Sequence, residues 1–370
     1  MSLLEFRNLT YSYNSRQKKP SLDNVSFKVE EGRRTAIIGA NGAGKSTTFY
    51  SFNGIFKPSS GEVLYRDRPL IYTKEALREL RNDICVVVQN PDEQIFSSTV
   101  ESDVAFGPMS MELPRDEVDK RIDSALAMVG MSEYRMRPST QLSYGQRKRI
   151  SLAGALAVRP KVLILDEPTA GLDPQMAREV MELVDELCCT GTTVIISTHD
   201  VDLIYSWAED IIVLNHGDLI YAGEPEEFFS DASKTASAGV ARPHTFSVNS
   251  YVSKMRGKEE APYPRTNSQF VAKMAPEGTV GGKIKLVPVG DTVEPAHFNG
   301  HVGAYGYSAK KALKALGIPI DYEFDALEMC MQDAVKGLDS VLYCDENMIK
   351  MARDRIDSLE TFGVKAEVIM

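Results

Sequence analysis

The chain has 370 residues, which exceeds one ordinary domain and predicts two. Hydrophobic residues make up 43% and charged residues 25%, which is typical of a globular protein, and no apolar run approaches the roughly 18 residues of a membrane span. A formal net charge of −10 gives no electrostatic basis for binding nucleic acid. The N-terminus shows no signal-peptide pattern, so we expect a cytoplasmic protein. Five scattered cysteines without a C-x-x-C pair predict reduced thiols.

The first 229 residues alternate strand-like and helix-like segments. Short continuous apolar runs are typical of strands buried on both faces, and they occur at 35–39, 83–88, 162–165 and 193–197. Two stretches with shorter alternating patterns, 5–28 and 61–71, predict an antiparallel flank. A helix-rich insertion covers 99–138 and contains an amphipathic helix at 116–129. We therefore expect an α/β domain with a mostly parallel sheet, an antiparallel β flank and a helical subdomain.

The pattern changes after residue 229. Residues 230–280 are rich in Ser, Ala, Lys, Arg and Pro and lack sustained periodicity, which predicts a partly flexible linker. Alternation resumes in 281–370, which predicts a small α/β domain. The expected strands and helices of that domain are 283–289, 308–316, 327–335, 340–344, 346–362 and 364–369.

A glycine-rich loop follows the first buried strand. The stretch Gly39-Ala-Asn-Gly-Ala-Gly-Lys-Ser46 matches G-x-x-x-x-G-K-[ST], and its glycines let successive backbone amides converge on phosphate oxygens. Lys45 would reach the β- and γ-phosphates and Ser46 would offer its hydroxyl to Mg²⁺. The alternative is a plain turn between a strand and a helix. The candidate nucleotide-binding residues of the loop are Gly39, Asn41, Gly42, Ala43, Gly44, Lys45, Ser46 and Thr47.

Two adjacent carboxylates end the hydrophobic strand at 162–165. Asp166 can hold the Mg²⁺ shell, and Glu167 can polarise a water in line with the γ-phosphate. The alternative is that both acids merely cap the next helix. His199 follows the strand at 193–197 and is placed to contact the γ-phosphate, although a lone histidine is often an ordinary loop residue. Together with the glycine-rich loop, these residues predict catalysis of phosphoryl transfer from ATP.

Leu142-Ser-Tyr-Gly-Gln146, just ahead of the strand at 162–165, resembles the signature sequence of ABC ATPases. Further pieces match that family in order. Gln89 stands where the family has a glutamine that senses Mg²⁺ and water, and Ala170-Gly-Leu-Asp173 corresponds to the loop that crosses between subunits. Tyr13 stands where an aromatic ring stacks on adenine. The resemblance covers residues 3 to about 229 and implies a P-loop ABC-type ATPase domain.

The resemblance also implies how two such domains work. They form a head-to-tail homodimer or heterodimer, with each ATP held between the phosphate loop of one subunit and the signature of the other. Ser143 and the Gly145 amide would contact the γ-phosphate across this interface, and Asp173 would lie in the crossing loop. Gln89 would join Ser46 and Asp166 around Mg²⁺, and Glu167, His199 and Gln89 would serve catalysis.

A narrower likeness concerns Gln89-Asn-Pro-Asp-Glu-Gln-Ile-Phe96, which is followed by 99–108. This stretch looks like the ATPase of energy-coupling-factor importers, especially the cobalt/nickel type. The likeness implies uptake of a transition metal ion or vitamin, and a peripheral location on the cytoplasmic face of the membrane. Gln94, Ile95 and Phe96 would receive coupling helices of integral membrane subunits, unless they are ordinary core residues.

A different class of function remains open at this point. Some ABC ATPases act without membranes, on nucleic acid or ribosomes. Those proteins usually carry long coiled-coil insertions or two fused ATPase domains, and neither pattern occurs in this sequence. The acidic balance also disfavours a nucleic-acid partner.

The C-terminal domain offers weaker signals. The glycine-rich stretch 300–306 precedes the helix expected at 308–316, which predicts either an anion site at the helix N-terminus or a simple structural turn. His297, His301 and Cys344 do not have the spacing of a known metal site. We hypothesise that residues 281–370 are regulatory.

Overall fold

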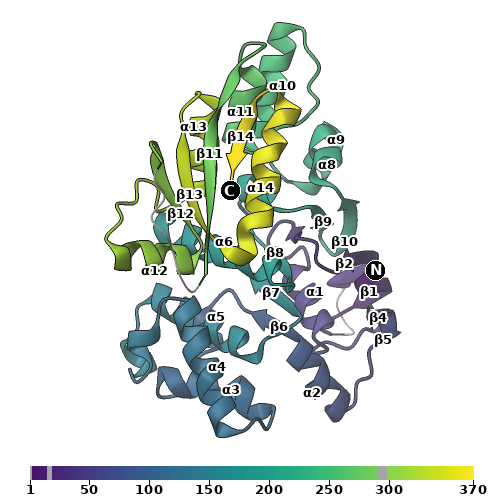
Figure 1. Ribbon diagram of the computed structural model, residues 1–370. Helices are drawn as coiled ribbons and strands as arrows, with labels where there is room; N and C mark the ends of the chain where they lie inside the picture. The colour runs from purple at the N-terminus through teal and green to yellow at the C-terminus, as the bar shows by residue number, and fades with distance from the viewer. Residues whose placement is uncertain (1, 15–18, 291–297) are drawn as a thin grey trace. The chain divides into compact units, whose positions relative to one another are not determined.

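The computed structural model describes residues 2–14, 19–290 and 298–370 (Figure 1). The chain forms two compact units, and their ranges are Met1–Val180 with Gly191–Ala241, and Met181–Thr190 with Arg242–Met370. The boundary near residue 241 differs from the expected ones at 229 and 280. Helix α6 (Pro174–Cys189) contributes to both units: its residues up to Val180 belong to the first unit, and those from Met181 belong to the second.

The first unit contains a six-stranded sheet in the order β10-β9-β3-β8-β7-β6. All neighbours in this sheet are parallel except β9 and β10, as the continuous apolar runs predicted. Its strands are β3 (Thr35–Ile38), β6 (Ile84–Val87), β7 (Val162–Asp166), β8 (Thr193–Ser197), β9 (Asp210–Asn215) and β10 (Asp218–Gly223). Every residue of β7 and β8 is buried, which explains why neither strand alternates apolar with polar residues.

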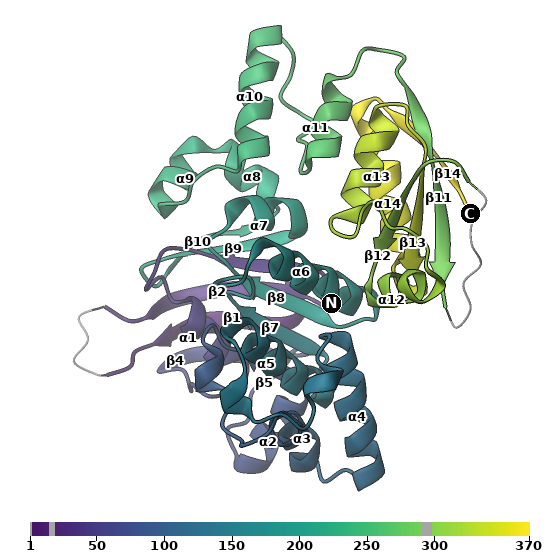
Figure 2. The ribbon, with the colours of Figure 1, turned by 90° about the vertical axis from the view of Figure 1, so that its left-hand side faces the viewer.

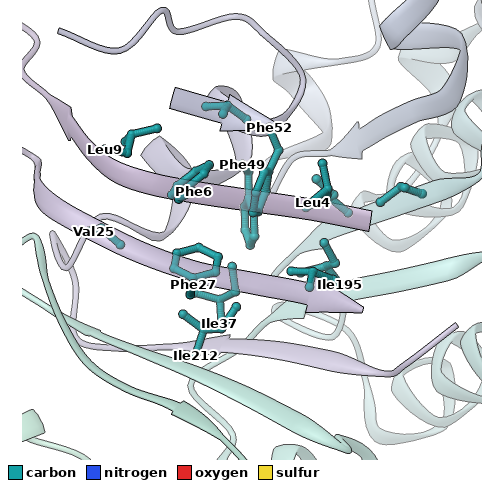
Figure 3. Close-up of a cluster of buried hydrophobic side chains, with 14 of the residues drawn as sticks. Leu4, Phe6, Leu9, Val25, Phe27, Ile37, Phe49, Phe52, Ile195 and Ile212 are labelled. Atoms are coloured by element: carbon teal, nitrogen blue, oxygen red, sulfur yellow. The ribbon is translucent and has the colours of Figure 1, made fainter. Parts of the chain in front are cut away.

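The expected antiparallel flank is a second sheet in the order β2-β1-β4-β5. Its strands are β1 (Ser2–Tyr11), β2 (Leu22–Glu30), β4 (Ser60–Tyr65) and β5 (Arg68–Pro69). One face of this sheet packs into the core around Phe6, whose ring lies 4.8 Å from that of Phe27 and 4.6 Å from that of Phe52 (Figure 3). The same core cluster includes Ile37 of β3 and Ile195 of β8, so buried apolar side chains join the two sheets.

The helices of the first unit include the predicted amphipathic helix, which is α4. Their bounds are α1 (Lys45–Phe52), α2 (Lys74–Asp83), α3 (Val100–Ser110), α4 (Arg115–Met128), α5 (Tyr144–Val158), α7 (Val201–Trp207), α8 (Pro225–Ser230) and α9 (Ala232–Ala238), with short 3₁₀ turns at Pro91–Glu93, Ser132–Tyr134 and Ser139–Gln141. Side-chain caps fix several starts: Thr73 begins α2, Thr99 begins α3 and Asp200 begins α7. Among the described residues, none of the helices combines the length and apolar character of a transmembrane span.

The second unit is built on an all-parallel sheet in the order β12-β13-β11-β14 (Figure 2). Its strands are β11 (Val280–Val289), β12 (His301–Tyr305), β13 (Ser340–Asp345) and β14 (Lys365–Ile369), and its helices are α10 (His244–Arg256), α11 (Asn267–Met274), α12 (Tyr307–Leu316), α13 (Ala326–Val335) and α14 (Ile349–Asp357), with 3₁₀ turns at Glu346–Met348 and Ser358–Phe362. Helix α12 packs against one face of the sheet, and α11, α13 and α14 belong to the core cluster on the other. Strands and helices also alternate over 281–370, where the sequence predicted a small α/β domain, although the compact unit itself covers Met181–Thr190 and Arg242–Met370.

The segment expected to be a linker, 230–280, carries helices α9, α10 and α11. Apolar periodicity did not indicate them because their buried faces are largely polar. In α10 the buried residues include Asn249, whose side-chain amide donates to the Glu260 carbonyl at 2.8 Å. In α11 the buried Ser268 donates its hydroxyl to Glu328 at 2.8 Å, so hydrogen bonds replace apolar packing there.

The glycine-rich stretch 300–306 forms strand β12 rather than an anion-binding loop. The backbone amides of Ser308 and Ala309, at the start of α12, donate to the carboxylate of Asp345 at 3.1 and 2.6 Å. The chain's own carboxylate therefore takes the place that an external anion would need. His301 contacts Asp333, with 2.8 Å between Nδ1 and Oδ2, and Cys344 lies in the core; His297 lies outside the described residues.

Candidate functional site

The carboxyl ends of four neighbouring parallel strands bring most of the predicted site residues to one edge of the six-stranded sheet. Strands β3, β8, β7 and β6 are hydrogen-bonded in this order. The loop from Gly39 follows β3, and Asp166 ends β7 opposite Ser197 of β8. Gln89 follows β6 at the same edge. This edge is where open α/β sheets place their ligand sites.

The predicted phosphate loop connects β3 to α1, which begins at Lys45. Gly44 has a left-handed φ of 110°, and a Cβ atom there would lie only 2.8 Å from the Ser21 carbonyl oxygen, so only glycine fits. The buried ammonium of Lys45 donates to the carbonyl of Gly39 at 2.7 Å. Burial lowers the pKa of Lys45, and the carboxylates of Glu167 and Asp166 oppose that shift.

The Ser46 hydroxyl donates to Oδ2 of Asp166 at 2.9 Å, which joins the glycine-rich loop to the acidic strand end. The other carboxylate oxygen of Asp166 accepts a short hydrogen bond from the Ser197 hydroxyl. A serine hydroxyl and a carboxylate are hard oxygen ligands of the kind Mg²⁺ prefers. The residues present therefore fit a magnesium site, with Ser46 and Asp166 as protein ligands and Ser197 orienting the carboxylate.

Glu167 is buried beside the exposed ring of His199. Oε1 of Glu167 lies 3.1 Å from Nε2 of His199 without hydrogen-bond geometry, and it has no hydrogen-bond partner among the residues that the structure describes. The backbone of Glu167 has a left-handed φ of 50°, which is strained for a non-glycine residue. Strain at a buried carboxylate with an unsatisfied oxygen is typical of a catalytic position.

The structure places the other nucleotide candidates near the loop or its edge of the sheet. Tyr13 is exposed, and its hydroxyl lies 3.0 Å from Oγ1 of Thr47. Its ring makes an edge-to-face contact with Phe56, which follows the end of α1, at 5.3 Å. Gln89 is exposed, and its backbone carbonyl accepts from the Tyr144 hydroxyl at 3.4 Å.

Ser143, Gly145 and Asp173 lie at helix N-termini. Ser143 caps α5 in a capping box with Gln146: its hydroxyl accepts from the Gln146 amide at 3.3 Å, and its own amide donates to the Gln146 side chain at 2.9 Å. Gly145 lies in the first turn of this helix. The Asp173 carboxylate accepts from the Met176 amide at 2.9 Å, so its side chain caps α6.

Of the three residues predicted to receive a membrane partner, only Phe96 is largely exposed, at 67%. Gln94 is part-buried: its side chain accepts from the Val88 amide and donates to the Ser151 carbonyl, which fastens the end of β6 to α5. The Phe96 ring lies 4.9 Å from that of Phe106, which is also exposed. The exposed Met109 follows Phe106 by three residues on α3, and we call Phe96, Phe106 and Met109 the Phe96 patch.

Two polar residues of this region escaped the sequence analysis. Ser197 could have been found from its position, because it ends the strand before His199. Lys148 lies on a helix face between buried residues such as Leu152, and its ammonium donates to the backbone carbonyls of Glu167 and Ala170. A charged residue in an otherwise apolar helix face was the available signal.

Several known proteins are similar to this chain in sequence and fold. The ABC transporter family matches residues 22–170. The energy-coupling factor transporter ATP-binding protein EcfA of Methanococcus maripaludis is 46% identical over 243 residues, which cover 66% of this chain and 87% of that protein. The chain belongs to the energy-coupling factor ATP-binding proteins of the ABC transporters. As a member of this ABC ATPase family, it binds and hydrolyses ATP, as the loop and acidic strand end predicted.

Two further relatives show how far the similarity reaches. The energy-coupling factor ATP-binding protein EcfA2 of Methanospirillum hungatei is 34% identical over 371 residues, covering 96% of this chain and 92% of that protein. The solved structure of CbiO1 from Clostridium perfringens, described as part of the ABC transporter complex CbiONQ, shares 42% identity with a TM-score of 0.56. That match covers 64% of this chain and 94% of CbiO1. The P-loop ABC ATPase fold predicted for the first domain is thus confirmed, and EcfA2 aligns with the C-terminal unit as well.

Proposed function

We propose that this energy-coupling factor ATPase drives uptake of a transition metal ion, cobalt or nickel, or of a vitamin through integral membrane subunits. The observation that carries the ATPase mechanism is the 2.9 Å hydrogen bond from Ser46 to Asp166 beside the buried Glu167. It supports a Mg²⁺ site and a general base at one sheet edge, next to a glycine-rich loop suited to phosphates.

In the proposed mechanism the loop 39–47 binds the ATP phosphates through its backbone amides, and Lys45 neutralises the β- and γ-phosphates. Ser46, Asp166 and Gln89 would hold Mg²⁺, which would neutralise phosphate charge when bound. Glu167 accepts a proton from the attacking water, since its buried carboxylate has an unsatisfied oxygen. His199, whose imidazole lies beside that oxygen, contacts the γ-phosphate.

The remaining nucleotide contacts follow from a head-to-tail dimer of two ATPase subunits, identical or different. Tyr13 stacks on adenine, which its exposed ring beside Thr47 permits. Ser143 and Gly145 contact the γ-phosphate bound to the other subunit from the N-terminus of α5, where backbone amides and the helix dipole favour an anion. Asp173 keeps the crossing loop in register by capping α6.

The membrane partner binds the Phe96 patch in this proposal, which makes the chain a peripheral protein of the cytoplasmic membrane face. Exposed aromatic and methionine side chains suit a hydrophobic coupling helix laid into a groove. Ile95 is half-buried and precedes Phe96 directly in the chain, whereas Gln94 bonds to Val88 at the end of β6 and to α5. The similarity to CbiO1, part of a transporter complex, supports this assignment.

The test is co-purification of the chain with membrane subunits from detergent-solubilised membranes of its source. We expect wild type to recover integral membrane proteins, Phe96→Asp to lose them, and Ile71→Asp to keep them. Ile71 is a matched control because its exposure of 65% is close to that of Phe96. If wild type recovers no membrane protein, the importer role is wrong, although the ATPase site stands.

The substrate class needs a second measurement. The recovered complex is placed in lipid vesicles, and ATP-dependent uptake of radioactive cobalt or nickel is compared with that of vitamins. The proposal expects uptake of one of these classes and none with Glu167→Gln. A complex that hydrolyses ATP and transports neither class would contradict the substrate proposal alone.

We also propose that residues 281–370 regulate the ATPase. Within the second unit, Asp185 of α6 accepts from the Tyr305 hydroxyl at 2.8 Å and from the Arg355 guanidinium at 3.2 Å. Glu182, on the same helix, forms a short ion pair with Lys310. Helix α6 begins directly after the crossing loop. These contacts therefore fix the second half of a helix whose first residues follow a proposed part of the ATP site.

The regulatory role is tested by removing the hydrogen bonds of Tyr305 and Arg355 to Asp185. Tyr305→Phe combined with Arg355→Met should change the hydrolysis rate several-fold, whereas Lys365→Met, which removes an exposed pair with Glu360, should not. The same change is expected on deletion of 281–370. If hydrolysis and transport stay unchanged at every substrate level in both variants, regulation by this unit is excluded.

A further inference from the structure

Lys148 is a buried cation in helix α5, which is capped by Ser143. Many of the other buried residues of α5 are apolar, and only 4% of Lys148 is exposed. Its ammonium donates to the carbonyl oxygen of Glu167 at 2.6 Å and to that of Ala170 at 2.8 Å. Burial lowers the pKa of Lys148 to about 8, although the nearby carboxylates of Glu167 and Asp166 oppose the shift. Burying a charge carries a large desolvation penalty, which these two hydrogen bonds help to offset.

The two carbonyls belong to the turn that carries the proposed general base. Glu167 has a left-handed φ of 50°, a strained conformation for a non-glycine residue that persists only where the surroundings enforce it. Its amide donates to the Ser197 carbonyl at 3.0 Å, and the Ala170 amide donates back to the Glu167 carbonyl at 3.2 Å. Strand β8 therefore holds the amide side of Glu167, and Lys148 holds the carbonyl side together with the end of the turn.

We propose that Lys148 is a positioning residue for ATP hydrolysis, which fixes the backbone of Glu167 and Ala170 to helix α5 without contacting the nucleotide. The inference rests on the proposed role of Glu167 as the general base. A carboxylate must be aligned with the attacking water to within a fraction of an ångström, and a misplacement of about 1 Å can cost on the order of 100-fold in rate. Lys148 supplies that alignment from the backbone side.

The position of Lys148 also links two parts of the ATPase dimer. The N-terminus of α5 carries Ser143 and Gly145, which serve the nucleotide of the other subunit in the proposed mechanism. Lys148 lies about one turn further along the same helix and holds the turn that serves the subunit's own nucleotide. A displacement of α5 would therefore reach Glu167 and Ala170 directly.

The first experiment compares Lys148→Met with wild type in the full chain. Methionine keeps most of the side-chain volume and removes both the charge and the donors. We expect ATP affinity, measured by titration calorimetry, to stay within about twofold, while kcat falls roughly 10- to 100-fold. The matched control is Lys161→Met. Lys161 lies at the opposite end of β7 and pairs with Asp83 at 2.9 Å, so its loss should leave kcat unchanged.

The second experiment separates positioning from general damage by a double-mutant cycle with Glu167→Gln. If Lys148 acts through Glu167, Lys148→Met slows wild type but adds little in the Glu167→Gln background, measured by single-turnover hydrolysis. Equal slowing in both backgrounds, or no slowing in either, overturns the proposal. If Glu167→Gln alone does not slow hydrolysis, the proposed role of Glu167 fails instead. Should Lys148→Met not fold, Lys148→Gln, which keeps a neutral donor, carries the same comparison, with a smaller loss expected.

Discussion

Replacing the buried glutamate at the end of β7 is the sharpest test of the catalytic site. Glu167→Gln preserves size and leaves the neighbour of Oε1, the imidazole of His199 at 3.1 Å, in place. It removes only the ability to accept a proton. Loss of a general base costs about 10²- to 10⁴-fold in rate, equivalent to roughly 3–5 kcal/mol of the barrier. ATP affinity should change little, because the proposed mechanism assigns phosphate binding to the loop 39–47.

This variant should also accumulate as a closed, ATP-bound dimer if, as proposed, ATP binding closes the dimer and hydrolysis reopens it. Phosphate release gives the rate, and light scattering after size-exclusion chromatography gives the mass in saturating ATP with Mg²⁺. Lys45→Met in the same background is the control, since its weaker ATP binding should leave it mostly monomeric at an ATP concentration that just saturates Glu167→Gln. If Glu167→Gln hydrolyses ATP at the wild-type rate, or stays monomeric in saturating ATP, the assignment of the base is refuted.

Three further outcomes are expected. Lys45→Met loses charge-assisted hydrogen bonds to phosphate worth about 1.5–3 kcal/mol, so calorimetry should show ATP binding weakened about 10- to 100-fold. Ser197→Ala removes the hydrogen bond that orients the Asp166 carboxylate, so the Mg²⁺ concentration for half-maximal hydrolysis should rise about 10- to 100-fold. The control Thr193→Ser, at the other end of β8, should leave this concentration unchanged. Burial raises the pKa of Glu186 to about 7 from an ordinary 4.5. The folded state therefore holds this proton more tightly, and the second unit should lose stability as the pH rises through about 7, with a smaller loss in Glu186→Gln, as measured by urea unfolding at about pH 6 and pH 8.

Local sequence predicted the elements that depend on short-range pattern. The apolar runs at 35–39 and 193–197 became β3 and β8 because a strand covered on both faces needs little besides continuous apolar residues. The glycine-rich loop was predictable for a related reason: its left-handed backbone at Gly44 is open to few other residues. The sequence analysis did not predict helices α10 and α11. Their buried faces contain polar residues such as Asn249 and Ser268, which form hydrogen bonds, so these helices lack the apolar periodicity of an amphipathic helix.

The sequence by itself predicted the chemistry of the ATPase, because the loop 39–46 and the pair Asp166–Glu167 have the residue types and order that ATP hydrolysis needs. Tertiary structure decided which groups support that chemistry. Ser197 reaches Asp166, and Lys148 reaches the Glu167 carbonyl, only because β8 and α5 pack against the end of β7. Asp345 likewise takes the amides at the start of α12 from 36 residues away along the chain. Such contacts join residues distant in sequence, and their geometry depends on packing that local periodicity does not encode.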